Sequence, residues 1–200
     1  IKENAYEMAD SKSESMSWIE LVVTKSSKNR VFNFTNISLV VLGSILLIIS
    51  AKIKVDLYPV PMTLQPLAVL MIGMLYGRSL ATSTIGLYIF QGAIGFPVFA
   101  YGGGLLSLCG PTGGFILGFL VAGLVLGHLA DKGWGRNIVT SLICMLIGLV
   151  IIYSFGILQL SVIKGFEYAL LKGFYPFLIG DLYKLLIAGL LVPFIWRLAK

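Results

Sequence analysis

Residues 95–118 read Gly-Phe-Pro-Val-Phe-Ala-Tyr-Gly-Gly-Gly-Leu-Leu-Ser-Leu-Cys-Gly-Pro-Thr-Gly-Gly-Phe-Ile-Leu-Gly. The stretch is uncharged, yet its consecutive glycines and its prolines argue against one uninterrupted helix. Glycine costs about 1 kcal/mol and proline about 3 kcal/mol in a helix interior, relative to alanine. Irregular apolar backbone is tolerated at membrane depth only where it packs against protein or lines a cavity. We therefore interpret the stretch as a loop that closes over something, between apolar segments of the chain.

The composition of the 200-residue chain indicates an all-α integral membrane protein. Hydrophobic residues make up 58% and charged residues 12% of the chain, and the mean hydropathy is +0.94. In soluble domains about a quarter of the residues are charged. The formal net charge is +6, and the basic residues lie mostly between apolar runs, as expected of the cytoplasmic loops of membrane proteins. Nucleic acid is therefore a poor partner, and the lipid bilayer is the expected one.

Six apolar segments are predicted to span the membrane, since a transmembrane helix needs about 20 mostly apolar residues. They are residues 34–51, 62–76, 79–94, the segment that begins at Pro111, 138–160 and 181–198. Residues 161–180 alternate charged and apolar side chains, which is typical of an amphipathic element lying on the membrane surface. Residues 1–30 are polar and form an N-terminal tail. The transmembrane domain is therefore expected to cover residues 31–200.

The distribution of lysine and arginine predicts the orientation of these spans, because cytoplasmic loops carry an excess of both. If the tail is inside, the inner segments hold Lys25, Lys28, Arg30, Arg78, Lys132, Arg136, Arg197 and Lys200, and the outer ones hold Lys52, Lys54, Lys164 and Lys172. Both termini are then cytoplasmic. The connection 52–61, the loop around residues 95–112 and the return 161–180 should lie together on the outer face.

Asp181 and Lys184 are the charged residues that this prediction places within a span. Their spacing puts them on one face of a helix, and an ionisable residue at mid-membrane costs about 2.5 to 3.5 kcal/mol on insertion scales. One interpretation is an interfacial ion pair with Lys184 extending outward. The other is a site for a small zwitterionic or amphipathic ligand. In a ligand site, further hydrogen bonds could come from polar residues that could equally hold helices together: Gln65, Tyr88, Gln91 and Tyr101.

Motifs for enzymatic chemistry are absent from the sequence. Gly110-Pro-Thr-Gly-Gly lacks the Gly-Lys-Ser/Thr ending of a nucleotide-binding loop. The single histidine, His128, belongs to no zinc-protease motif, and no Gly-x-Ser-x-Gly elbow occurs. Cys109 and Cys144 have no metal-ligand spacing. We therefore expect no enzymatic activity, no catalytic residues, no metal and no cofactor.

Four motifs, in their order and spacing, resemble the BioY family. They are Pro61-Met-Thr-Leu-Gln65, Gly92-Ala-Ile-Gly-Phe-Pro-Val-Phe-Ala100, Gly110-Pro-Thr-Gly-Gly-Phe115 with Gly118, and Gly180-Asp-Leu-Tyr-Lys184. Proteins of this family are the biotin-binding S components of energy-coupling factor (ECF) transporters. The resemblance covers residues 36–200. It implies a six-helix S-component-like bundle in the cell membrane, with cytoplasmic termini and an outward-facing pocket for one biotin.

The resemblance also implies partners and a ligand chemistry. The partners are an ECF coupling transmembrane protein and two cytoplasmic ATPases, and biotin is the transported ligand rather than a cofactor. In this hypothesis Asp181 accepts hydrogen bonds from the ureido N–H groups, and Lys184 meets either the ligand's carbonyl or its carboxylate. The loop 102–108 covers the apolar body of the ligand. The alternatives are a stand-alone biotin facilitator, an S component for another vitamin, and a membrane scaffold in which Asp181 and Lys184 pair only with each other.

Overall fold

The computed structural model describes residues 31–198, and the predicted tail 1–30 lies outside the described residues. The described part is helical, with one short β-hairpin. Its helices are α3 (Val31–Lys52), α4 (Gln65–Ala93), α5 (Leu105–Cys109), α6 (Gly113–Asp131), α7 (Ile138–Lys164), α8 (Phe166–Gly173) and α9 (Leu178–Leu198), with 3-10 turns η1 (Trp134–Arg136) and η2 (Tyr175–Phe177). The hairpin pairs β1 (Lys54–Val55) with β2 (Met62–Thr63) in antiparallel fashion.

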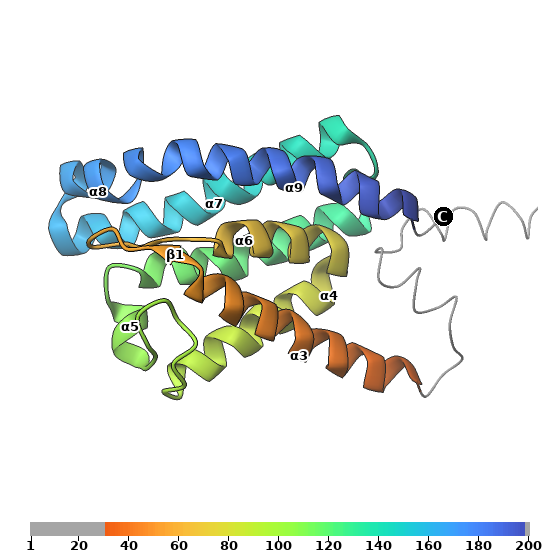
Figure 1. Ribbon diagram of the computed structural model, residues 1–200, viewed down its shortest axis with the longest axis horizontal. Coiled ribbons are helices and arrows are strands. Elements are labelled where there is room, and N and C mark those ends of the chain that lie inside the picture. Colours follow the sequence, from red (N-terminus) through yellow and green to blue (C-terminus); the bar gives the residue numbers. More distant parts are fainter. Residues whose placement is uncertain (1–30, 199–200) are drawn as a thin grey trace, which may run out of the picture.

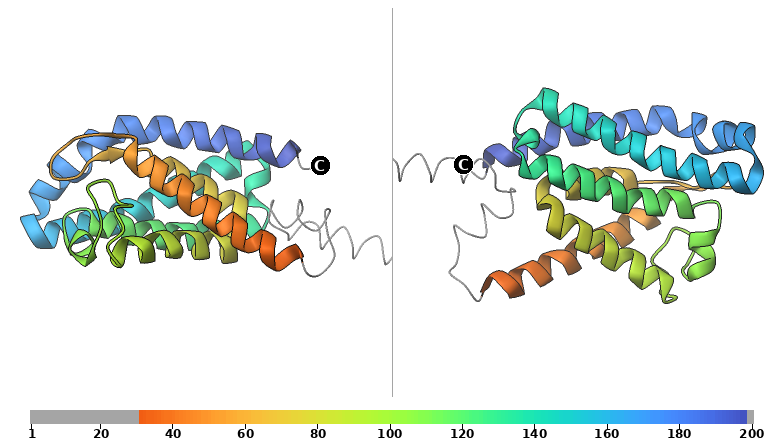
Figure 2. Two further views of the ribbon diagram at one scale, coloured as in Figure 1. Left: turned by 60° about the horizontal axis from the view of Figure 1, so that its bottom comes forward. Right: turned by 180° about the vertical axis from the view of Figure 1, so that it is seen from behind.

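The helix α4 is broken at Gly77, which adopts φ 75° and ψ 173°. Glycine reaches such positive φ values at no steric cost. The chain reverses its direction at this bend, so residues 65–76 and 78–93 both extend from it toward the end of the bundle where the β-hairpin and α5 lie (Figures 1 and 2). Within residues 31–198, five helices are long and apolar enough to cross a membrane, with α4 counted once. When the two halves of α4 are counted separately, the prediction of six apolar helical segments is confirmed.

Three connections gather at one end of the bundle. The hairpin, the segment around α5, and α8 lie at this end, whereas the bend of α4, η1 and the end of α9 lie at the other (Figure 1). The prediction that these three connections lie together is therefore confirmed. We refer to this end of the bundle as the loop end.

The helix α6 packs between α4 and α7 in the centre of the bundle. On the α7 side the backbones approach closely, because a Cβ atom on Gly118 would lie 3.0 Å from Ile152 Cα. Small residues allow such contacts between membrane helices, where van der Waals packing drives association. Buried apolar side chains fill the space on both sides of α6, and they include Leu70, Met74, Leu126, Met145 and Val192 on one side and Leu47, Val69, Ile85 and Phe119 on the other.

Several predicted boundaries were wrong by a few residues, including the start of the fourth segment, which lies at Gly113 rather than at Pro111. The second span begins at Gln65 rather than at residue 62, because Met62 and Thr63 pair with β1. The helix α7 continues to Lys164, four residues beyond the predicted end, and α9 begins at Leu178, three residues before Asp181. Between them lies the short helix α8, in which Glu167 and Lys172 are exposed while Ala169 is buried, as the predicted amphipathic element requires.

Candidate functional site

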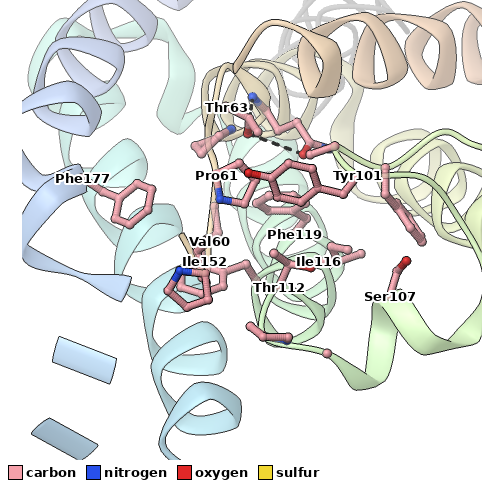
Figure 3. A pocket seen from close by; sticks show the side chains of 18 of the residues that line it. Val60, Pro61, Thr63, Tyr101, Ser107, Thr112, Ile116, Phe119, Ile152 and Phe177 are labelled. Carbon is pink, nitrogen blue, oxygen red and sulfur yellow. Dashed lines mark hydrogen bonds between the residues drawn. The ribbon is translucent and has the colours of Figure 1, made fainter. Parts of the chain in front are cut away.

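A pocket of about 300 Å³ opens at the loop end of the bundle. This volume is at the lower limit of the roughly 300 to 1,000 Å³ that small-molecule sites occupy. Figure 3 shows side chains from the hairpin connection, the loop after α4, and helices α6 and α7 around a common space. Its apolar walls include Val60, Phe99, Phe115, Ile116, Phe119, Ile152 and Phe177. The pocket is therefore formed by segments far apart in the sequence.

The polar centre of the pocket is a buried ion pair between Asp181 and Lys184. Lys184 Nζ lies 2.6 Å from Asp181 Oδ1, and the side chains are only 11% and 7% exposed. The same ammonium group donates to the carbonyl oxygen of Thr63, at 2.7 Å. The predicted shared face is confirmed, and the lysine also ties α9 to the hairpin. Because buried ion pairs need further hydrogen bonds to offset desolvation, this extra bond helps to hold the charged pair in place.

The second carboxylate oxygen of Asp181 is occupied as well. The Tyr153 hydroxyl of α7 donates to Asp181 Oδ2 at 2.5 Å. The ring of Tyr153 lies edge-on to Phe115 and Phe174, with centroids 6.2 Å and 5.1 Å away. The carboxylate is thus held by donors from two different helices.

Gln65 lines the pocket, and Tyr88 lies behind it. Gln65 Nε2 donates to the Tyr88 hydroxyl at 2.7 Å, and that hydroxyl donates to the carbonyl oxygen of Val98 at 3.5 Å. The Tyr88 side chain is fully buried and is not part of the pocket lining. It therefore supports Gln65 from behind.

Gln91 lies away from the pocket. Its Oε1 accepts a hydrogen bond from the Ser44 hydroxyl at 2.7 Å, which connects the second half of α4 to α3. The structure thus brings Asp181, Lys184, Gln65 and Tyr101 to the pocket lining but leaves Gln91 between two helices. Such a bond is the helix-joining role that polar side chains commonly have in membranes.

Tyr101 lines the pocket next to a charged cluster on the hairpin. Lys54 Nζ lies 3.8 Å from the centroid of the Tyr101 ring and 2.7 Å from Asp56 Oδ1. Hydrogen bonding from Lys54, and to a lesser extent from Tyr101, holds the pKa of the Asp56 carboxyl below its usual value. Partial burial and the neighbouring Asp56 raise the pKa of the Tyr101 hydroxyl. The tyrosine is therefore protonated at neutral pH, while the carboxyl is ionised.

The segment 95–112 is held over the pocket by side chains from two helices. Lys52 Nζ at the end of α3 donates to the carbonyl oxygen of Phe99 at 2.6 Å. Gln159 Nε2 of α7 donates to the carbonyl oxygens of Leu108 and Gly110 at 2.9 and 2.8 Å. Because Phe99, Tyr101, Ser107 and Gly110 all line the pocket, the loop predicted to close over something covers this cavity.

Two contacts of the ion pair, those with the Tyr153 hydroxyl and with the backbone of Thr63, could not be predicted from the sequence. Tyr153 is one aromatic residue in a long apolar helix, and Thr63 contributes a backbone oxygen rather than its side chain. Within residues 31–198, no cluster of three or more metal-ligating side chains occurs. The arrangement offers a carboxylate, an ammonium group and an amide inside a largely apolar cavity. It can bind a small molecule that has both hydrogen-bonding groups and an apolar body.

The sequence of the chain is similar to that of a known family of membrane proteins. The sequence profile of the BioY family matches residues 24–200. The chain is 39% identical over 134 residues to the probable biotin transporter BioY of Pyrococcus horikoshii. This alignment covers 66% of this chain and 78% of the relative. The chain is 38% identical over 117 residues to the biotin transporter BioY of Thermotoga maritima, spanning 58% of this chain and 68% of the relative.

A solved structure shares the fold. It is the crystal structure of the S-component for biotin from an ECF-type ABC transporter, with a TM-score of 0.76 and 23% sequence identity. The alignment covers 86% of this chain and 95% of the other. The bundle is therefore an S-component fold.

Proposed function

Since the chain belongs to the BioY family, we propose that it takes up biotin, as the membrane-embedded S component of an ECF-type transporter. Its relatives are named as biotin transporters, so the function is transport rather than catalysis. The observation that carries the proposal is the buried Asp181–Lys184 pair in the wall of an otherwise largely apolar pocket. Such a pair is costly in a membrane protein and by default indicates a functional site.

The chemistry of biotin matches this pocket. Its ureido ring carries two N–H donors and a carbonyl, its thioether ring is apolar, and its side chain ends in a carboxylate. Asp181 accepts from the ureido N–H groups, and Lys184 meets an acceptor of the ligand, either the carbonyl or the carboxylate. Gln65 and Tyr101 add polar contacts from the pocket wall. The aromatic residues Phe115, Phe119 and Phe177 pack against the apolar body of the ligand.

The orientation and the partners follow from the same assignment. We place the pocket on the outer face of the cell membrane and both termini in the cytoplasm, as the distribution of lysine and arginine along the sequence predicts. A coupling transmembrane protein and two cytoplasmic ATPases energise uptake. Uptake by cells that express the chain should therefore increase when these partners are co-expressed. Equal uptake in a host without any coupling protein would favour a stand-alone facilitator instead.

Equilibrium binding of labelled biotin to the purified full chain in detergent tests the proposal. Hydrogen bonds to charged groups contribute about 1.5 to 3 kcal/mol, so Asp181→Asn and Lys184→Met should each weaken binding at least about tenfold. Lys132→Met is the matched control, because Lys132 is exposed and follows the end of α6 that points away from the pocket. Unchanged binding in both pocket variants would refute the site. Failure of the folded wild-type chain to bind biotin, with binding of thiamine or riboflavin instead, would refute the ligand.

A further inference from the structure

The Asp181 carboxylate has one donor on each of its oxygens, and the two donors come from different helices. Lys184 Nζ lies 2.6 Å from Oδ1, and the Tyr153 hydroxyl lies 2.5 Å from Oδ2. Lys184 sits on the same helix as Asp181 and is itself held by the Thr63 carbonyl oxygen, but its single bond to Oδ1 does not fix the rotation of the carboxylate about the Cβ–Cγ bond. Tyr153 belongs to α7 and provides an anchor outside α9.

The Tyr153 hydroxyl is itself held in a fixed position. The ring makes edge-on contacts with Phe115 of α6, at an interplanar angle of 83°, and with Phe174 near α8, at 87°. The residue is 8% exposed and lines the pocket. Edge-to-face aromatic pairs add about 0.5 to 1.5 kcal/mol beyond the burial of area. The donor therefore comes from a rigid ring rather than from a flexible side chain.

A carboxylate offers about four lone-pair sites on its two oxygens. In this pocket the protein uses one on each oxygen, and one on each remains for a ligand. A ligand with two N–H donors needs those remaining sites in a defined plane. A displacement of a fraction of an ångström weakens hydrogen bonds that act as a pair, so the plane must be fixed before the ligand arrives.

We propose that Tyr153 is a positioning residue that sets the plane of the Asp181 carboxylate, and thereby its preference for a ligand with two unblocked ureido N–H groups. This inference rests on the proposed function. The tyrosine acts on the ligand through Asp181, and removal of its hydroxyl should impair recognition of the ureido end more than recognition of any other part.

The test compares Tyr153→Phe with the wild-type chain in equilibrium binding of three ligands: biotin, biotin methylated on one ureido nitrogen, and biotin methyl ester. Loss of the hydroxyl should weaken biotin binding about tenfold and reduce the preference for biotin over the N-methylated analogue by at least about threefold. The preference for biotin over the ester should not change. Tyr183→Phe is the matched control, because Tyr183 lies on α9, is 65% exposed and does not line the pocket, and it should leave all three affinities unchanged.

A merely structural role predicts a different pattern. If Tyr153 only filled space, Tyr153→Phe would weaken all ligands equally or not at all, and the preference for unblocked ureido groups would remain; that result overturns the inference. Thermal unfolding without ligand checks that the variant is folded, as expected from the retained ring contacts. Replacement of Tyr153 by 4-aminophenylalanine keeps the ring and a donor, and it should keep the preference within about threefold of the wild-type value.

If the 4-aminophenylalanine variant lost the preference for biotin over the N-methylated analogue as completely as Tyr153→Phe, the inference would also fail. Failure of the proposed function has a separate signature, since the wild-type chain would then not bind biotin at all.

Discussion

Lys52 Nζ donates to the carbonyl oxygen of Phe99 at 2.6 Å, although one residue ends α3 and the other lies in the loop over the pocket. The two residues are 47 positions apart in the sequence. Phe99 lines the pocket, and its ring lies edge-on to Tyr88 at 5.4 Å. The bond thus connects the end of α3 nearest the loop end to the cover of the candidate ligand site.

Lys52→Met should therefore speed the release of biotin. The bond is charge-assisted but partly exposed, so we expect about a 3- to 10-fold increase in the dissociation rate. The association rate should change less, since affinity differences within one complex arise mostly in dissociation. Release of labelled biotin after dilution measures this rate, with Lys132→Met as the control. An unchanged dissociation rate would show that the bond does not hold the loop.

Gln159 provides the second attachment of the same loop. Its amide nitrogen donates to the carbonyl oxygens of Leu108 and Gly110, and Gln159→Leu removes both bonds. The Gly110 carbonyl oxygen keeps its bond from the Gly113 N–H, whereas the half-buried Leu108 carbonyl oxygen loses the Gln159 donor. A hydrogen bond contributes about 0.5 to 1.5 kcal/mol, so the variant should have a lower unfolding temperature and weaker biotin binding. Ser154→Ala on α7 is the control, because that hydroxyl is exposed and bonds only within its own helix, to Val150. Equal effects of the two variants would contradict this assignment.

Gly113 begins α6 where the backbone of the loop passes it closely. A Cβ atom at this position would collide with the carbonyl oxygen of Leu108, so Gly113→Ala forces the loop to move. Overpacking of this kind costs about 1 to 3 kcal/mol, and both thermal stability and biotin affinity should fall. Gly86→Ala is the control, because a Cβ atom there meets nothing within 4 Å. It should be neutral or stabilising by up to about 1 kcal/mol; comparable losses in both variants would count against the collision.

The lowered pKa of Asp56 predicts how the stability of the folded chain depends on pH. Lys54 and Tyr101 hold the pKa of its carboxyl below the usual 3.8, so the ionised form is favoured in the folded state. The resulting stabilisation is fully present above about pH 4 and is lost as the pH falls through the lowered pKa. The difference in unfolding temperature between the wild-type chain and Asp56→Asn should be constant from pH 5 to 8 and should disappear under more acidic conditions. A difference that changes near neutrality would implicate another group.

The transmembrane helices and the Asp181–Lys184 pair could be predicted from the sequence. Apolar length identifies a span, and a spacing of three places two charges on one helix face. The contribution of Tyr153 could not be predicted, because the apolar residues of α7 are spread around the whole helix and its sequence does not say which face meets α9. The sequence predicts Gln91 as a residue of the ligand site, but its amide oxygen accepts a hydrogen bond from Ser44 of α3 instead. Which interface a polar side chain enters depends on the rotation of its helix within the bundle.

The break at Gly77 has a consequence for how the chain enters the bilayer during synthesis. The helix formed by residues 65–76 is about 18 Å long at 1.5 Å per residue, well short of the roughly 30 Å hydrocarbon core. A helix of this length does not insert stably by itself, so it must enter together with residues 78–93 as one hairpin. Gly127 of α6 packs against the bend, since a Cβ atom there would lie 2.6 Å from Arg78 Cα. The position of this helical hairpin therefore depends on α6, and the pocket, which also takes Asp181 and Lys184 from α9, is complete only when the last helix has joined the bundle.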